Sequence, residues 1–155
     1  MPDLKLIALD AEDLSVISAH LQDAVVRVVD MAYVPGEKRF ALIANRFDWE
    51  KALKKGRKAD DRKSIERRRS ALRFERVMTA RVHGLDLTDK RAALALLAIT
   101  FEPKTGSDAP GGDVTLTFSG GAAIRISVEY LELEMKDLGA VWSAKRSPVH
   151  PDDQT

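Results

Sequence analysis

The sequence contains no cysteine, so disulfide bonds, thiolate catalysis and cysteine-ligated metals are all excluded. Histidine is nearly as scarce: there are three, and none has the spacing of an H-E-x-x-H or similar metal motif. The sequence also lacks G-x-S-x-G, Walker and G-x-G-x-x-G motifs, so serine hydrolysis, nucleotide hydrolysis and dinucleotide binding have no local support. We therefore expect no metal and no cofactor, and we favour a non-catalytic protein over an enzyme.

Long apolar runs are missing as well. No stretch approaches about 18 apolar residues, and the N-terminus lacks the basic and apolar regions of a signal peptide. We expect a cytoplasmic protein without a membrane partner, because the absence of cysteine also fits a reducing compartment. With 155 residues the chain is long enough for one domain with a sizeable core, present as a monomer or a weak homodimer.

The clearest strand pattern lies between residues 94 and 128. Residues 94–101 are apolar on both faces, which predicts a central, covered strand. Residues 113–118 and 122–128 then form a hairpin. Only a three-residue loop, Ser119 to Gly121, places Leu116 opposite Ile124 and brings both apolar sets to one face. Such a loop usually ends on a left-handed residue, here Gly121.

The rest of the chain predicts one helix and further hairpins. Residues 4–9 form a short strand, and Asp10 caps a helix that runs from residue 11 to about residue 22. Residues 24–34 pair with 39–47 across a type II turn at Pro35-Gly36, with Met31 opposite Phe40. Residues 72–83 pair with 93–102. Residues 131–138 fit either a strand or a helix, and we favour the strand.

Together these elements predict an α+β fold, a predominantly antiparallel β-sheet or barrel of hairpins with an N-terminal helix. Residues 1–142 form a single domain with a basic loop at 51–69, and residues 143–155 form a C-terminal strap and tail. The number and order of hairpins also leave room for a pleckstrin-homology-like arrangement. That analogy concerns the fold only and would not define a function.

Positive charge is concentrated in one segment. Residues 51–69 contain ten basic and three acidic residues, a net charge of +7, whereas the whole chain carries only +1. Guanidinium groups bind phosphates as bidentate donors, so this segment and the strand after it could bind nucleic acid or a protein partner. The alternative is a solvated insertion without a role. The candidate binding residues are Arg67, Arg68, Arg69, Arg73 and Arg76.

A second candidate site combines two tryptophans and one histidine. Trp49 and Trp142 flank segments that leave regular structure, and with His83 they could line a pocket. Anchoring of the chain ends to the core is the more common role of such aromatic residues. His83, Asp86 and Asp89 could also hold a metal, but Asp and Gly at this spacing are what a turn between strands requires, and we favour the turn.

Several short motifs spread over nearly the whole chain carry a resemblance. They are Phe47-x-Trp49-Glu50, Arg69-Ser70-Ala71-Leu72-Arg73-Phe74, Leu96-Leu97-Ala98-Ile99-Thr100-Phe101-Glu102-Pro103, Gly120-Gly121-Ala122-x-Ile124-Arg125, Asp137-Leu138-Gly139-x-x-Trp142 and Pro148-x-His150-Pro151. In combination they resemble a family of uncharacterised α-proteobacterial proteins defined only as a domain of unknown function. The resemblance implies a bacterial, cytoplasmic, single-domain protein and brings no catalytic residues with it.

Two functions follow as hypotheses. The first is a non-catalytic binding or scaffolding domain for a protein or nucleic-acid partner, engaged through residues 51–81. The alternative is a small enzyme or small-molecule-binding protein with a pocket near Trp49, His83 and Trp142.

Overall fold

The computed structural model describes residues 4–48, 67–105 and 110–139. Trp49 and Trp142 of the predicted pocket, residues 51–66 of the basic loop and the C-terminal strap at 143–155 lie outside these ranges. The elements are β1 (Lys5–Ala8), α1 (Ala11–His20), β2 (Ala24–Val34), η1 (Pro35–Glu37), β3 (Arg39–Phe47), β4 (Arg67–Phe74), β5 (Val77–His83), β6 (Ala93–Pro103), β7 (Gly112–Phe118), η3 (Ser119–Gly121), β8 (Ala123–Val128) and β9 (Leu133–Asp137).

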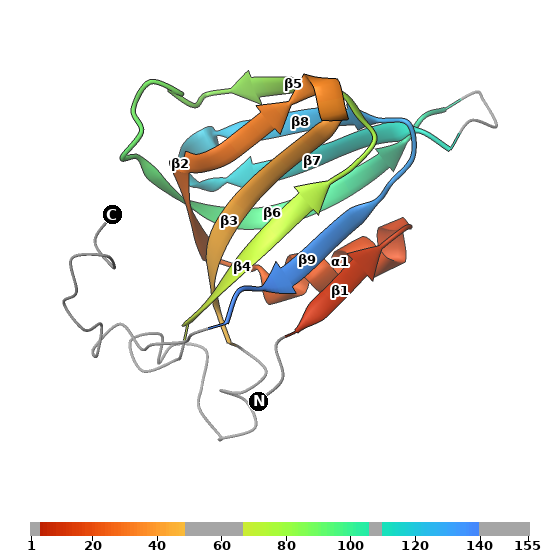
Figure 1. Cartoon of the computed structure of the whole chain (residues 1–155). Helices are drawn as coiled ribbons and strands as arrows, with labels where there is room; N and C mark the ends of the chain where they lie inside the picture. The colour runs from red at the N-terminus through yellow and green to blue at the C-terminus, as the bar shows by residue number, and fades with distance from the viewer. Residues whose placement is uncertain (1–3, 49–66, 106–109, 140–155) are drawn as a thin grey trace.

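The nine strands form one antiparallel sheet in the order β1-β9-β4-β3-β2-β6-β7-β8-β5 (Figure 1). β1 and β5 are the two edge strands, so the sheet is open and does not close into a barrel. The predicted α+β class with a dominant antiparallel sheet and an N-terminal helix is therefore confirmed. No helix among the described residues is long and apolar enough to cross a membrane.

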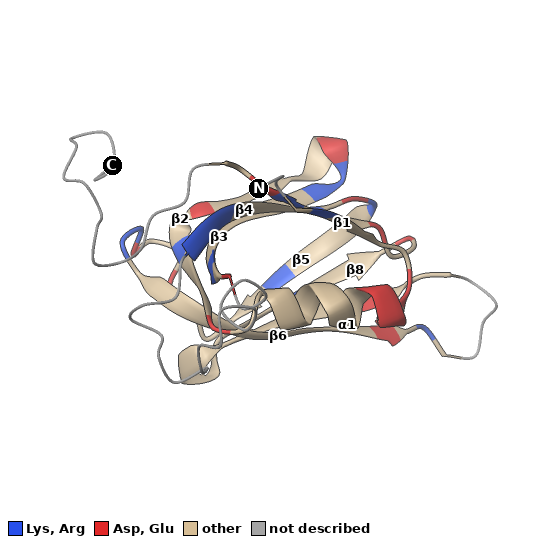
Figure 2. Cartoon of the chain, turned by 90° about the horizontal axis from the view of Figure 1, so that it is seen from below, with Lys and Arg blue, Asp and Glu red and all other residues tan. Residues whose placement is uncertain are grey.

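Strand β2 divides the sheet into two layers. Its first residues pair with both β3 and β6, its last residues pair with β3 alone, and the register shifts between Val26 and Met31. A register shift of this kind bends a strand and increases its twist. Figure 2 shows the result: β1, β4 and β3 lie in one layer and β6, β8 and β5 in the other.

The core fills the space between these layers. Buried and exposed side chains alternate along β4 and β8, because successive residues of a strand point to opposite faces of the sheet. Each buried Leu, Ile or Phe contributes about 1.5–3 kcal/mol to stability. The largest fully buried side chains come from α1 and both layers: Phe74, Phe118, Leu14, Ile17, Leu21, Leu42, Leu72, Leu96, Leu116, Ile124 and Ile126.

The two layers are connected at each open side of the sheet, by α1 at one side and by the tip of the β2–β3 hairpin at the other. α1 contacts both β1 and β6, and the Ser18 hydroxyl accepts a hydrogen bond from the Ile99 amide over 3.0 Å. Opposite, the β2–β3 hairpin reaches the edge strand β5, where the Val77 amide donates to the Lys38 carbonyl over 2.9 Å. The sheet is thus held in its bent shape at both open sides.

Three local predictions are confirmed. Asp10 caps α1, with its carboxylate accepting from the Asp13 amide over 2.8 Å. In the β7–β8 hairpin Leu116 lies opposite Ile124, and Gly121 has the left-handed φ of 81°. Residues 133–137 form the strand β9 and not a helix.

The predicted β2–β3 register is wrong by two residues. Met31 lies opposite Leu42, and Phe40 faces Tyr33. The reason is the connection, which is the short 3-10 helix η1 followed by Lys38 in a left-handed conformation (φ 50°) rather than a type II turn at Pro35-Gly36.

The predicted pairing of 72–83 with 93–102 is also wrong. The segment breaks at Arg76, whose left-handed φ of 61° turns the chain from β4 into β5. β5 then pairs with β8, while β6 pairs with β2 and β7. β6 is central, as predicted, but it is not covered on both faces, because Leu97 is 45% exposed.

Replacing Gly121 with valine tests the hairpin register. A β-branched side chain resists positive φ, so Gly121→Val should lower the free energy of unfolding by about 1–2 kcal/mol. The matched control Thr117→Val, at an exposed strand position of the same hairpin, should change it by less than about 0.5 kcal/mol. Urea denaturation measures both values, and equal losses would contradict the register.

Candidate functional site

The arginines of β4 point to two different faces of the sheet. Arg67, Arg69 and Arg73 lie on the outer face, and Arg68 lies on the inner face beside Ser70 and Leu72. The alternation follows from the period of two along a strand. The predicted binding arginines therefore do not converge on one surface, and Arg67 to Arg69 belong to a strand and not to the predicted loop.

On the inner face, Arg46 and Asp137 form a buried ion pair. Arg46 Nη2 donates to Asp137 Oδ2 over 2.8 Å, and Arg46 Nε donates to Asp137 Oδ1 over 3.1 Å. The Ser70 hydroxyl donates to the same Oδ1 over 2.6 Å. Arg46 and Asp137 are each 2% exposed and Ser70 is fully buried, so water does not compete for these bonds.

The Asp137 carboxylate also holds the first strand. Its Oδ2 accepts from the Leu4 amide over 3.1 Å, and the Asp137 amide donates to the Leu4 carbonyl over 2.9 Å. Burial alone would raise the pKa of Asp137, but hydrogen bonds from Arg46 and Ser70 and the charge of Arg46 outweigh it and hold the pKa below its ordinary value. A carboxylate with a lowered pKa is a weak base, so this cluster is suited to stabilising the sheet rather than to activating Ser70.

Arg68 forms a second buried ion pair at the same end of the sheet. Its Nε donates to Asp48 Oδ2 over 2.8 Å, and both side chains are 8% exposed. Removing one partner of such a pair leaves an uncompensated buried charge. Arg68 is therefore a structural residue, although the sequence suggested it for binding.

The outer face of the same layer carries three exposed cations and one half-buried cation, Arg67, on three neighbouring strands. We call Lys5 of β1, Lys136 of β9, and Arg67 and Arg69 of β4 the basic face. Lys5 lies directly opposite Lys136, and Lys136 opposite Ala71 of β4. Figure 2 shows the blue segments of β1 and β4 in this layer. The one acidic residue among the outward positions of these three strands is Glu134, which lies 3.9 Å from Lys5.

Arg67 occupies a special place on the basic face. Its guanidinium lies 4.4 Å from the centre of the Phe47 ring, a cation–π contact between adjacent strands. Its Nε atom is buried without a hydrogen-bond partner, and this burial lowers the pKa of Arg67. Among the described residues no carboxylate forms an ion pair with Arg67, so the Phe47 ring is the contact that the structure shows for its charge.

The two remaining candidate arginines, Arg73 and Arg76, form ion pairs with carboxylates. Arg73 lies 2.8 Å from Glu75 and 3.3 Å from Glu134. Arg76 lies 3.8 Å from Glu132, and its guanidinium lies 5.1 Å from the Tyr130 ring centre. These arginines belong to surface ion-pair networks, so we do not include them in the basic face.

His83, at the exposed end of β5, is the described member of the predicted tryptophan pocket. Asp86 accepts from both the amide and the hydroxyl of Thr88, over 2.9 and 2.6 Å, and these bonds lower the pKa of Asp86. This is the hydrogen bonding of an Asx turn, which agrees with the turn predicted for the segment. Among the described residues no group of three or more His, Asp or Glu could hold a metal ion.

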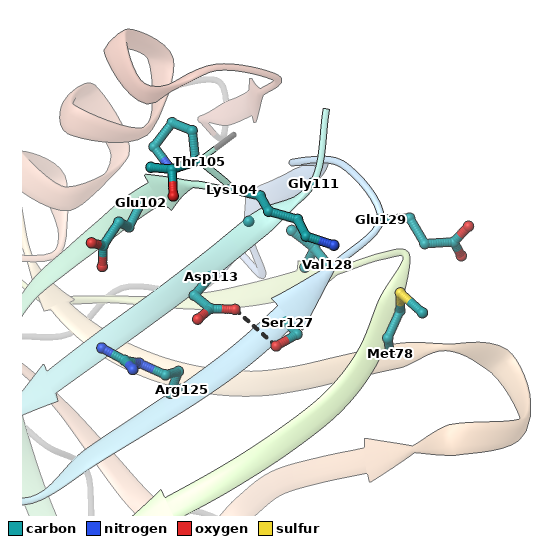
Figure 3. Close-up of a pocket in the computed structure, with 12 residues that line it drawn as sticks. Met78, Glu102, Lys104, Thr105, Gly111, Asp113, Arg125, Ser127, Val128 and Glu129 are labelled. Atoms are coloured by element: carbon teal, nitrogen blue, oxygen red, sulfur yellow. Dashed lines mark hydrogen bonds between the residues drawn. The ribbon is translucent and has the colours of Figure 1, made fainter. Parts of the chain in front are cut away.

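A cavity of about 630 Å³ lies elsewhere, against the outer side of β6, β7 and β8 (Figure 3). Asp113 and Ser127 project into it from adjacent strands, and Arg125 lies at its edge. The sequence analysis missed this site. Its polar residues come from β6 and from the β7–β8 hairpin, where they occupy outward strand positions that no local motif marks.

A family model described as "Protein of unknown function (DUF2948)" matches residues 4–150 of the chain. Neither the curated proteins nor the solved structures include a significant match.

The Asp137→Asn variant tests the buried cluster. Loss of this carboxylate leaves Arg46 uncompensated, so the variant should lose about 3–5 kcal/mol of stability at neutral pH. The pKa of Asp137 is lowered on folding from an ordinary value of 3.8, so its stabilising effect is present above that pH and disappears as the pH falls through the folded value.

The difference in stability between wild type and Asp137→Asn should therefore shrink in acid, as measured by chemical denaturation from neutral to low pH. Glu134→Gln, on the outer side of the same strand, is the control and should cost less than about 1 kcal/mol. A pH-independent difference would show that the ion pair is not its cause.

Proposed function

Since the chain belongs to the DUF2948 family, whose function is unknown, we propose from the chemistry of its surface that it is a non-catalytic domain that binds nucleic acid through the basic face. Phosphate contacts supply most of the affinity of such proteins, and they require cations that the protein has not already neutralised. The basic face meets this requirement.

The observation that carries the proposal is that carboxylates of the described residues neutralise the cations of the basic face only weakly or not at all. Arg69 and Lys136 are exposed, and within the described parts of the chain neither forms an ion pair. Lys5 approaches Glu134 only at 3.9 Å, the limit of an ion pair. On the inner face, by contrast, Arg46 and Arg68 are each matched with a carboxylate at 2.8 Å.

The sequence next to the basic face adds to its charge. Residues 51–66, which precede Arg67, contain seven basic and three acidic residues. A segment of this composition joined directly to the basic face extends the set of cations available to a polyanion. A protein partner with an acidic surface would use the same cations, and the experiment below separates the two.

The pleckstrin-homology-like arrangement and the bacterial, cytoplasmic setting remain predictions from the sequence. We keep both as proposals, and the proposed function depends on neither of them.

The proposal predicts a salt-dependent affinity carried by the basic face. If Lys5, Arg67, Arg69 and Lys136 each neutralise one phosphate, log affinity should fall against log salt with a slope near about −3.6 for duplex DNA or about −2.8 for single strands. The double variant Arg69→Gln/Lys136→Gln removes two contacts, so it should make the slope shallower by about 1.8 for duplex DNA or about 1.4 for single strands. Fluorescence anisotropy with labelled oligonucleotides at several salt concentrations measures this.

Arg27→Gln, an exposed arginine on β2 outside the basic face, is the matched control and should leave the slope unchanged. Arg68→Gln should instead lower the melting temperature, because its partner Asp48 is buried. No binding of single- or double-stranded probes at low salt would overturn the proposal. Binding that survives the double variant with an unchanged slope would do the same.

A further inference from the structure

A second set of cations lies on the outer side of the other layer. Arg125 of β8 is directly opposite Arg81 of β5, and both side chains are exposed. Directly opposed residues of an antiparallel pair have Cβ atoms about 4.5–5.5 Å apart, and like charges at that distance destabilise the pair. Within the parts of the chain that the structure describes, neither arginine forms an ion pair or a side-chain hydrogen bond.

Arg125 of this pair lies at the edge of the cavity of about 630 Å³ (Figure 3), and Arg81 lies beside it on β5, outside the cavity lining. Arg125 lines the cavity, and the next outward position on β8 is Ser127, whose hydroxyl donates to Asp113 Oδ1 over 2.8 Å. Asp113 Oδ2 accepts no hydrogen bond from a described residue and is available as an acceptor. Glu102, directly opposite Asp113 on β6, adds a second carboxylate.

At Gly111 and Gly112, beneath the cavity, the backbone packs too closely for any residue but glycine. A Cβ atom at Gly111 would lie 2.8 Å from the Val128 carbonyl oxygen, and one at Gly112 would collide with the Glu102 carbonyl oxygen and the Phe101 ring. The cavity wall is therefore backbone held in a tight ladder.

The cavity thus has two chemically different ends. At one end the Arg125 guanidinium, with Arg81 beside it on the neighbouring strand, presents bidentate donors that have no acceptor among the described residues. At the other end, two residues further along the strands and so about 7 Å away, carboxylates present acceptors. The lining at this end holds the carboxylates of Glu102, Asp113 and Glu129 and one cation, Lys104, so a polyanion would meet net repulsion there. A small molecule with one oxyanion and several hydroxyl or amino groups satisfies both ends.

We propose that this cavity binds a small polar metabolite whose phosphate or carboxylate group lies between Arg81 and Arg125 and whose hydroxyl or amino groups donate to Asp113 and Glu102. The site is separate from the basic face, because it lies on the opposite layer of the sheet. Its proposed ligand is a small molecule, whereas the proposed ligand of the basic face is a nucleic-acid polymer.

Titration of the full chain followed by ¹H–¹⁵N NMR tests the site with three probes. Glucose 6-phosphate and gluconate offer hydroxyl groups with a phosphate or a carboxylate, and glucose offers hydroxyl groups alone. The proposal predicts amide shifts in β5, β7 and β8 with at least one charged probe and none with glucose; which charged probe binds more tightly identifies the oxyanion. No shift with either charged probe would overturn it, as would shifts confined to β1, β4 and β9.

Single substitutions then separate the two ends. Arg81→Gln and Arg125→Gln should each weaken binding of the preferred probe by about tenfold or more, and the double variant should lose less than the product of the two because they share one oxyanion. Arg27→Gln should have no effect. Asp113→Asn should weaken binding of the sugar probe but not of inorganic phosphate. Unchanged affinity in both arginine variants, or equal losses of both ligands in Asp113→Asn, would contradict a two-ended site.

Discussion

The fold depends most on the buried ion pair between Arg46 and Asp137. These residues are 91 positions apart in the sequence, yet the pair and the Ser70 hydroxyl connect β3, β4 and β9 through their inner faces. The hydrogen bond from the Leu4 amide to Asp137 adds the edge strand β1. Burying two charges is favourable only when every polar atom finds a partner, and here the carboxylate accepts four hydrogen bonds.

The two faces of strand β4 have different roles. On the inner side of β4, Arg68 forms an ion pair with the buried carboxylate of Asp48 and so stabilises the sheet. Its outer residues Arg67 and Arg69 have no acidic partner among the described residues and remain available to a polyanion. Strand β8 in the other layer also has one face toward the core and one toward solvent. Ile124 and Ile126 lie in the core, while Arg125 between them faces solvent and the cavity. Both proposed sites therefore lie on outward positions of strands whose inward positions hold the fold together.

Local structure could be predicted from the sequence wherever neighbouring residues decide it. The alternation around Leu116 and Ile124 predicts the β7–β8 register, and Asp10 predicts the start of α1. The pairing of β5 could not be predicted, because it follows from a left-handed Arg76 that local preferences disfavour. For the buried cluster one signal was present: Arg46 and Arg68 occupy inward positions of apolar strands. Their partners come together only through the order of strands in the sheet, and so does the pairing of Arg81 with Arg125, whereas the predicted β7–β8 register already places Asp113 opposite Ser127.

A double-mutant cycle between Arg46 and Asp137 tests most directly whether this pair holds the strands together. The free energy of unfolding is measured for wild type, Arg46→Met, Asp137→Leu and the double variant. The two single variants should each be strongly destabilised, while the double variant should recover part of the loss, giving a coupling energy of about 2 kcal/mol or more. A coupling energy within about 0.5 kcal/mol of zero would contradict the account, because it would mean that the two residues stabilise the sheet independently.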